Sequence, residues 1–378
     1  MLFTSRPVGD AMATTIWGTA SSWTLTALPL FVWMGEILFR TKLSENLFKG
    51  LSPWMQKLPG GLIHVNVVGC ALFAAISGSS AATVATVGKM SIPELRKRNY
   101  PEKILLGSLA GSGTLGLLIP PSIILIIYGV AVQESIAKLF IAGIIPGIMI
   151  ALIFMSYVII WSLINKKEMP KILEEYSFLE KIKRSKQLLP VILLISAVIG
   201  SIYTGVATAT EAASLGVVGA LILSYFQKSL TLETFKSSLL GATKTSCMIA
   251  FILAGSTFLS LAMGFTGLPR NLAIWIQGME LSPYVLILVL MIFYIILGMF
   301  LDGISAVVLT MAIIEPMIRQ AGFDMIWFGI FLVIVVEMAQ ITPPVGFNLF
   351  VLQGMANKDM GYIATVSYTH LRAHETSH

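Results

Sequence analysis

The sequence predicts an all-α polytopic membrane protein made of two inverted repeats, each with a re-entrant helical hairpin and a broken transmembrane helix. Composition supports the membrane class, since 56% of the 378 residues are hydrophobic and only 12% are charged. The mean hydropathy is +0.86. The repeats are indicated by a pair of interrupted apolar segments that recurs in the same order in each half.

The interruptions are clearest in the second half of the chain. Asp302 and Gly303 lie within an apolar run, and a charge at membrane depth costs roughly 2.5–3.5 kcal/mol, so Asp302 is a candidate functional residue. A second apolar run is broken at residues 342–346, Thr-Pro-Pro-Val-Gly. Such a break frees backbone carbonyls, which a membrane tolerates only where they face protein or water. A carboxylate near free carbonyls suits a hard cation such as sodium.

The first half contains the same two interruptions. Gly78, Ser79 and Ser80 interrupt one apolar run, and Pro120-Pro121 interrupts the next. Gly78 precedes Pro121 by 43 residues, and Gly303 precedes Pro344 by 41. Paired breaks at corresponding positions of two halves are the best sequence indication of a transporter binding site.

The apolar runs divide the chain into two repeats and a connector. The first repeat covers residues 1–165, the connector 166–187, and the second repeat 188–365. The predicted elements are a weakly hydrophobic segment at 1–20, spans at 25–39, 139–164, 188–203, 211–226 and 247–265, hairpins at about 62–88 and 284–318, and broken helices at about 104–130 and 326–352. Residues 40–59, 89–103 and 227–244 are predicted polar loops, the last with an amphipathic piece.

The basic residues predict the orientation of the spans. If each hairpin enters and leaves on one side, 21 of the 25 Lys and Arg residues fall on the same side of the membrane. The positive-inside rule names that side cytoplasmic. The first hairpin then enters from the cytoplasm and the second from outside, so the two halves are inverted.

Simpler interpretations of these features remain open. Ser79, Ser80 and Thr83 could be small residues that allow close helix packing. Asp302 could pair with another buried polar group, and the Pro-Pro breaks could be plain kinks. Four other acidic residues are expected near the membrane interfaces or paired with Lys or Arg: Glu36, Glu211, Glu315 and Glu337.

Several function classes lack their signatures in this sequence. It contains no cluster typical of a metal site, no Ser/His/Asp arrangement and no phosphate-binding glycine loop. Cys70 and Cys247 lie in apolar runs and imply no disulfide framework. We therefore expect a non-enzyme with no cofactor, apart from sodium as a coupling ion, and no nucleic-acid partner.

Five runs together resemble the large membrane subunit, DctM, of the tripartite ATP-independent periplasmic (TRAP) transporters. They are AAISGSSAATVATVGKMSIPEL, GSGTLGLLIPPSIILIIYGV, TATEAASLGVVGALI, MFLDGISAVVLTMAIIEP and ITPPVGFNLFVL. The resemblance implies a sodium-driven, elevator-type importer in the bacterial inner membrane. It also implies a small membrane subunit and an extracytoplasmic solute-binding protein as partners, and a carboxylate-bearing solute such as a C4-dicarboxylate or sugar acid.

The resemblance also assigns site residues, motif by motif. It places Gly78, Ser79 and Ser80 at the cytoplasmic hairpin tip, and Asp302 with Gly303 at the periplasmic tip. The residues implied for the two sodium sites are Gly78, Ser79, Ser80, Gly116, Pro120, Asp302, Gly303, Thr342, Pro343 and Gly346. Those implied for the solute are Ser79, Thr83 and Asn348.

The two ends of the chain differ from the family pattern. In the family a further hydrophobic segment precedes the stretch that corresponds to residues 14–31, and a further membrane region follows residue 365. Here residues 366–378 are polar and rich in histidine, and they resemble translated sequencing-adapter sequence. We expect this tail to be non-native.

Three other functions are compatible with parts of the pattern. A stand-alone sodium–carboxylate symporter of the same superfamily would need no binding protein, and neighbouring genes would distinguish it. A membrane-embedded enzyme would need a nucleophile or metal cluster that the sequence lacks. A non-transporting scaffold or channel is disfavoured by the paired breaks.

Overall fold

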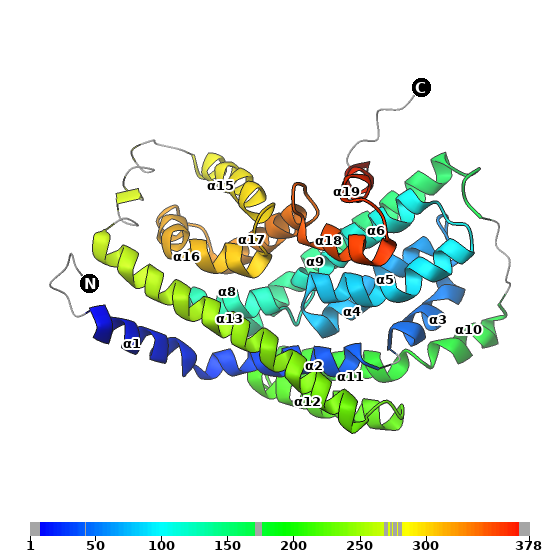
Figure 1. Ribbon diagram of the computed structural model, residues 1–378, viewed down its shortest axis with the longest axis horizontal. Helices are drawn as coiled ribbons and strands as arrows, with labels where there is room; N and C mark the ends of the chain where they lie inside the picture. Colours follow the sequence, from blue (N-terminus) through cyan, green and yellow to red (C-terminus); the bar gives the residue numbers. More distant parts are fainter. Residues whose placement is uncertain are drawn as a thin grey trace.

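The protein is described by a computed structural model that covers residues 8–41, 43–170, 176–267, 271–272, 274, 278 and 282–369. All regular secondary structure within these residues is helical (Figure 1). A helix satisfies its own backbone hydrogen bonds, which a chain in a bilayer must do. The predicted all-α class is therefore confirmed.

The first part of the chain forms the helices up to residue 164. Polar residues begin several of them: Ser79, Ser122 and Ser135 each accept a backbone N–H at the start of the helix that follows. The elements are α1 (Val8–Ala20), η1 (Trp23–Thr26), α2 (Ala27–Phe39), α3 (Leu43–Met55), α4 (Ile63–Ser77), α5 (Ser80–Lys97), α6 (Glu102–Gly113), α7 (Leu115–Leu118), α8 (Ile123–Ala131) and α9 (Ile136–Ile164).

The second part repeats this scheme after a short connecting helix. Thr208, Thr231, Ser282 and Asp324 cap helices there in the same way. The elements are α10 (Phe178–Ser185), α11 (Leu189–Tyr203), α12 (Ala209–Phe226), α13 (Leu232–Thr266), α15 (Pro283–Gly298), α16 (Gly303–Gln320), α17 (Met325–Gln340), α18 (Phe347–Ala356) and α19 (Met360–Thr369).

Four of the described helices are each long and apolar enough to cross a membrane: α9, α12, α13 and α16. The number rises to seven if each bent helix pair is one span, including α6–α7 with α8, which bend by 40° at residues 119–122. Large apolar side chains point outward on these helices, for example Ile145 of α9 and Phe251 of α13. A lipid environment accounts for such exposure better than water does.

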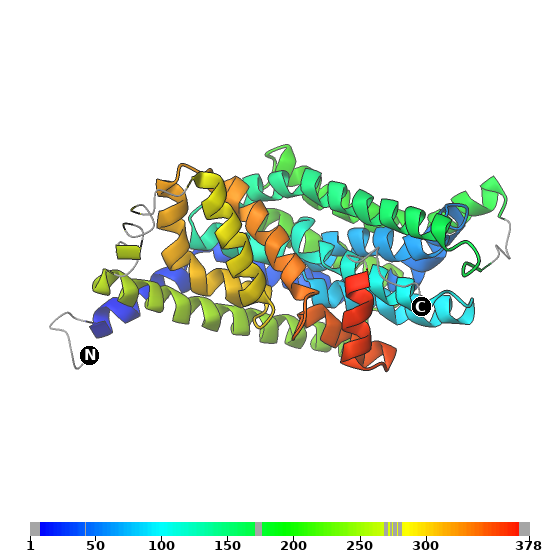
Figure 2. The ribbon, with the colours of Figure 1, turned by 90° about the horizontal axis from the view of Figure 1, so that it is seen from above.

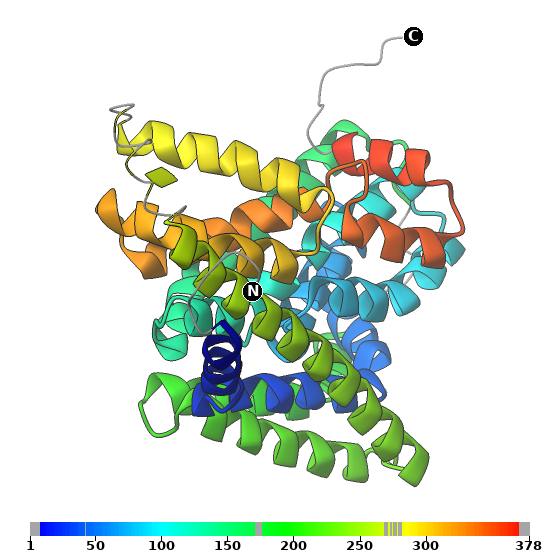
Figure 3. The ribbon, with the colours of Figure 1, turned by 60° about the vertical axis from the view of Figure 1, so that its left-hand side comes forward.

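The helices form two groups (Figures 1 and 3). One group contains α1, α2, α11, α12 and α13, in which α2 packs against both α12 and α13. The other contains the hairpin α4–α5, the hairpin α15–α16 and the broken helices α6–α8 and α17–α18. Figure 2 shows the long helices α9 and α13 along opposite edges, with hairpins and broken helices between them. The groups meet where α2 packs on α4 and α8, and α13 on α16.

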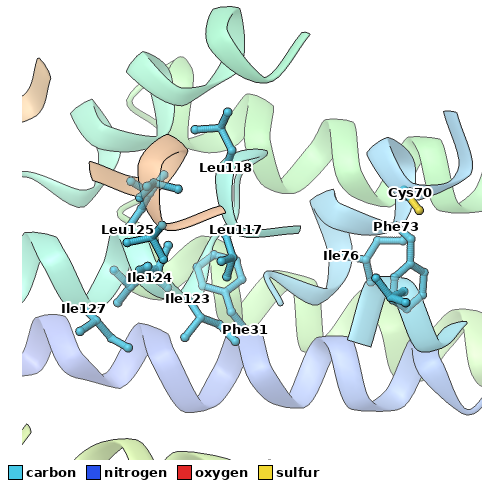
Figure 4. Packing of buried hydrophobic residues seen from close by; sticks show 14 of the residues in the cluster. Phe31, Cys70, Phe73, Ile76, Leu117, Leu118, Ile123, Ile124, Leu125 and Ile127 are labelled. Carbon is cyan, nitrogen blue, oxygen red and sulfur yellow. The ribbon is translucent and has the colours of Figure 1, made fainter. Parts of the chain in front are cut away.

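A continuous apolar core fills the contact between the groups (Figure 4). Phe31 of α2 lies against α8 and is 6.0 Å, centroid to centroid, from the Phe140 ring of α9. Leu117, Ile123 and Phe73 complete the same core from the first break and from α4. The first break is therefore enclosed by apolar side chains.

Three predicted loops are wrong. Residues 43–55 of the predicted loop 40–59 form α3. Residues 89–97 continue α5, and residues 232–244 belong to α13, a single helix of 35 residues. From the sequence, we expect the first of these two helices to end before Lys89 and the second to begin after Lys244. Lysines mark the membrane surface, but a helix supplies its own backbone hydrogen bonds in water as well, so it can project beyond the bilayer.

The connector and the C-terminal segment contain helices too. Within 166–187, α10 packs on α3, and the indole N–H of Trp54 donates to Ser185 Oγ at 2.7 Å. Helix α19 extends to Thr369, into the segment expected to be a non-native tail, and Val366 is buried. Residues 370–378 lie outside the described part of the chain.

Candidate functional site

The first hairpin turns within two residues, Gly78 and Ser79. Gly78 ends α4 with φ +60°, a left-handed conformation that glycine adopts without a Cβ penalty. Ser79 is extended, and its Oγ accepts the Ala82 N–H at 3.5 Å to begin α5. The local sequence Ser-Gly-Ser-Ser thus supplies both a helix end and a helix start at the tip.

The first tip contacts the first broken helix directly. The N–H of Ile123, the first residue of α8, donates to the Gly78 carbonyl at 3.2 Å. A Cβ on Gly78 would lie 2.8 Å from the Pro121 carbonyl oxygen, and one on Gly116 would lie 2.5 Å from that of Ser79. Only glycine fits at either position, so the hairpin tip and the break pack backbone against backbone with no side chain between them.

A small cluster of oxygens lies beneath this tip. Ser77 Oγ and Thr83 Oγ1 are 2.8 Å apart, and Thr83 Oγ1 donates to the Ser79 carbonyl at 2.8 Å. Thr83 is fully buried. Hydroxyl and carbonyl oxygens without nitrogen or sulfur are the ligands that a hard cation prefers.

The second tip is organised by Asp302, which caps α16. Its Oδ2 accepts the N–H groups of Ile304 and Ser305, each at 3.1 Å, and its Oδ1 accepts the Ser305 hydroxyl at 2.5 Å. A carboxylate at a helix N-terminus is favoured by the helix dipole. Asp302 is therefore held rigidly, with its charge at the tip.

The second tip and the second break make the counterpart of the first contact. The Gly346 N–H donates to the Met299 carbonyl at 3.4 Å. Gly346 and Ile123 occupy corresponding positions, each two residues after the second proline of its break. The prolyl bonds Pro120–Pro121 and Pro343–Pro344 are both cis. In each half, then, an amide at the break donates to a carbonyl near the hairpin tip.

Both tips open onto one cavity of about 440 Å³. The hairpin group contributes residues 77–82 and 302–304, together with Gln340 at the end of α17. The other group contributes Glu36 and Phe39 of α2, and Thr245 and Met248 of α13. Among the described residues, its lining contains two carboxylates, Glu36 and Asp302, and no lysine, arginine or histidine.

Comparison with known proteins identifies the family. The model of the tripartite ATP-independent periplasmic transporter DctM component matches residues 1–370. The chain belongs to the DctM family. It is 33% identical over 352 residues to the C4-dicarboxylate TRAP transporter large permease protein DctM of Pseudomonas aeruginosa, covering 93% of this chain and 82% of that one.

Further relatives support the same family and fold. The 2,3-diketo-L-gulonate TRAP transporter large permease protein YiaN of Escherichia coli is 32% identical, over 91% of this chain and 81% of its own. The crystal structure of the Alcanivorax borkumensis YdaH transporter matches with a TM-score of 0.62 at 12% identity, covering 98% of this chain and 86% of that one. That likeness concerns the fold, which is that of a membrane transporter.

The site residues expected in this DctM-family chain fall into two sets. Gly78, Ser79, Ser80, Asp302 and Gly303 line the cavity. The remaining ones do not line it: Gly116, Pro120, Thr342, Pro343, Gly346, Thr83 and Asn348. Gly116 and Thr83 instead contact the backbone of Ser79 at the first tip.

Asn348 occupies an unexpected environment. It follows the second break and is 0% exposed, and neither side-chain amide atom has a hydrogen-bond partner among the described residues. Its neighbour Phe347 reaches the cavity, but Asn348 does not line it. Its expected contact with solute stays a prediction.

Gln340 is a cavity residue that the sequence analysis missed. Its Oε1 accepts the Ser80 hydroxyl at 3.1 Å, which joins the first tip to the end of α17. It also lies beside the second tip, since a Cβ on Gly303 would be 3.0 Å from Gln340 Nε2. An amide two residues before Thr342, inside an apolar run, was the available signal.

Glu337 was expected near a membrane interface or paired with Lys or Arg, and this prediction is wrong. It is only 3% exposed, and its carboxyl group lies beside the backbone N–H groups of Leu117 and Leu118 at the first break. Its Oε1 has no partner among the described residues. Two of the other acidic residues pair with arginine as expected: Glu36 with Arg40, and Glu315 with Arg319 at 2.9 Å.

Proposed function

We propose that this protein is the large permease subunit of a sodium-coupled importer of a carboxylate-bearing solute. The observation that carries the proposal is the convergence of the two capped tips, and of the first residues of the helices after the two breaks, on one cavity whose largely apolar lining includes hydroxyl, amide and carboxylate groups. Two relatives support the solute class, since the C4-dicarboxylates and the 2,3-diketo-L-gulonate for which they are named bear a carboxylate.

The charge of the cavity supports coupling to a cation. Among the described residues its lining carries two carboxylates, of which Glu36 pairs with Arg40, and no basic side chain, so an anionic solute entering alone meets the like charge of Asp302. At about 4 Å, two like charges repel by roughly 4 kcal/mol at an effective dielectric constant of 20. Sodium bound behind the tips supplies the opposite charge, and sodium and solute then strengthen each other's binding reciprocally.

The two helix groups support an elevator-like movement. In the proposed cycle the hairpins and broken helices move as one body that carries the site, against the group formed by α1, α2 and α11–α13. The basic side is cytoplasmic, as the positive-inside rule predicts, and the membrane is the bacterial inner membrane. A small TRAP membrane subunit and an extracytoplasmic solute-binding protein complete the system.

The deciding experiment is uptake into proteoliposomes. The subunit is reconstituted with the small subunit and given radiolabelled succinate, malate and a sugar acid, with and without an inward sodium gradient and the binding protein. Uptake that needs both supports the tripartite importer, whereas uptake with sodium alone supports the alternative, a stand-alone symporter. Uptake unchanged when potassium replaces sodium and the pH gradient is collapsed contradicts sodium coupling.

A matched pair of variants links this activity to the site. Asp302→Asn keeps a capping side chain but removes the charge at the tip, and we expect it to abolish sodium-driven uptake. Asp324→Asn is the control, because Asp324 also caps a helix, accepting the Trp327 N–H at 2.8 Å, but does not line the cavity. Equal activity of the two variants would argue against a role for Asp302 in coupling.

A further inference from the structure

A second cavity of about 380 Å³ lies beside the central one. It is formed where the end of α2, the middle of α5 and the first turns of α13 meet. Its lining differs in charge from that of the central cavity, because it includes two cations, Arg40 and Lys89, and one carboxylate. The lining residues are Phe39, Arg40, Thr41, Thr86, Lys89, Glu233, Thr234 and Ser237.

The two cavities adjoin at α2. Phe39 lines both, and Glu36 of the central cavity pairs with Arg40 of the second. Arg40 also donates from Nε to Ser237 Oγ at 3.0 Å. An anion leaving the central cavity on this side therefore passes from a lining with carboxylates to one with a guanidinium and an ammonium group.

Two groups in the second cavity have unused binding capacity. Thr86 is only 3% exposed, lines the cavity, and its Oγ1 has no hydrogen-bond partner among the described residues. Lys89, one helical turn further along α5, forms no ion pair with any described residue. A buried hydroxyl without a partner is costly, so a ligand that hydrogen-bonds to it would be stabilised.

We infer that this cavity is an anion-binding station that receives the carboxylate of the solute as it leaves the central cavity. Lys89 and Thr86 hold the carboxylate, and Arg40 attracts it while remaining paired with Glu36. Glu36 and Glu233 limit the net positive charge, which keeps binding weak enough for release. The inference rests on the proposed function for the identity of the ligand, but the cavity's preference for anions can be measured without transport.

The first test measures that preference by thiol chemistry. Thr234→Cys is placed in a Cys247→Ser background, because Thr234 lines the cavity and is half-buried. Its rates of reaction with anionic sulfonatoethyl and cationic trimethylammonioethyl methanethiosulfonate are compared. We expect the ratio of anionic to cationic rate to fall roughly tenfold on adding Lys89→Gln, since removing one nearby charge slows one reagent and accelerates the other.

The control is Lys97→Gln, which removes the same charge from the same helix at an exposed position outside the cavity. It should leave the ratio unchanged. An equal effect of both variants, or no effect of Lys89→Gln, overturns the inference. A cysteine that reacts with neither reagent also overturns it, since the cavity would then not admit a solute from water.

A transport measurement connects the station to the solute. Proteoliposomes are loaded with increasing concentrations of succinate, and efflux is measured through molecules whose second cavity faces the inside. Lys89→Gln should raise the succinate concentration for half-maximal efflux several-fold and leave the sodium dependence unchanged. If succinate and the other carboxylates are not transported at all, the proposed function fails while the reagent ratio still reports on the cavity. Normal efflux by Lys89→Gln, with wild-type transport intact, refutes the station alone.

Discussion

Replacing Gly116 with alanine tests whether the contact between the first hairpin tip and the first break is part of an ion site. An alanine Cβ there would lie 2.5 Å from the Ser79 carbonyl oxygen and 2.7 Å from Thr83 Oγ1. Ordinary van der Waals contact begins near 3.4 Å, so tip and break must separate by roughly 0.9 Å. Functional sites tolerate displacements of only about 0.5 Å.

Two effects follow from that displacement. Overpacking of this kind lowers the free energy of unfolding by about 1–3 kcal/mol. The Ser79 carbonyl would also leave its place in the oxygen cluster, and the loss of a contact worth about 1.4 kcal/mol weakens binding tenfold. We therefore expect Gly116→Ala to raise the sodium concentration for half-maximal uptake at least tenfold, with a modest fall in thermal stability.

The assay is uptake against sodium concentration in proteoliposomes, with thermal unfolding followed in detergent. Gly255→Ala in α13 is the matched control, because nothing lies within 4 Å of a Cβ at that position. In a helix this change is worth about 1 kcal/mol in favour of alanine, so the control should be at least as stable as the wild type. A wild-type sodium dependence in Gly116→Ala would refute an ion site at the first tip.

Three further changes probe the surrounding contacts. Gln340→Ala leaves the Ser80 hydroxyl without its partner and should lower the free energy of unfolding by about 1–3 kcal/mol; unaltered thermal unfolding and solute affinity would contradict a role for this bond between the first tip and the end of α17. Glu337→Ala leaves a void beside the first break and should lower the free energy of unfolding by about 2–4 kcal/mol, whereas Glu337→Gln keeps the shape and should lower it less than half as much; equal unfolding temperatures of the two variants would exclude a role for Glu337 in filling and bonding this position. Thr83→Val removes a hydroxyl from the oxygen cluster at constant volume and should weaken sodium dependence more than stability, which the same two assays separate.

The hairpin tips and helix breaks are predicted well from the sequence, because the residues that form them act directly on the local backbone. Gly78 and Asp302 interrupt apolar runs, and each begins or ends a helix at a hairpin tip. Pro121 and Pro344 break the following runs at corresponding positions. Glycine, proline and a capping carboxylate act on the backbone next to them, so their effect can be read without knowledge of the packing.

The helix ends outside the apolar runs were less predictable. Lys89 and Lys236 lie within helices, although the sequence analysis placed both in loops. Hydropathy locates the bilayer, whereas the helix ends where a cap or a turn stops it. For α13 these positions are Thr231, which caps its start, and Gly267, which ends it with φ +71°.

The contacts between the two halves explain why Gln340 was missed and why the environment predicted for Glu337 was wrong. The repeats correspond in backbone design, with Ile123 and Gly346 making matching hydrogen bonds to their hairpins. The side chains that join the halves do not correspond: Gln340 bonds to the first tip, and Glu337 reaches the amides of the first break.

In register, Thr114 is the counterpart of Glu337, seven residues before the second proline of its break, and its hydroxyl donates to the Gly111 carbonyl in the preceding turn of the same half. A repeat in sequence therefore predicts what each half builds by itself. The partners of a side chain that crosses between the halves depend on how the halves are packed. Since the central cavity lies at that junction, the residues that are hardest to predict from the repeat are the ones that hold its two sides together.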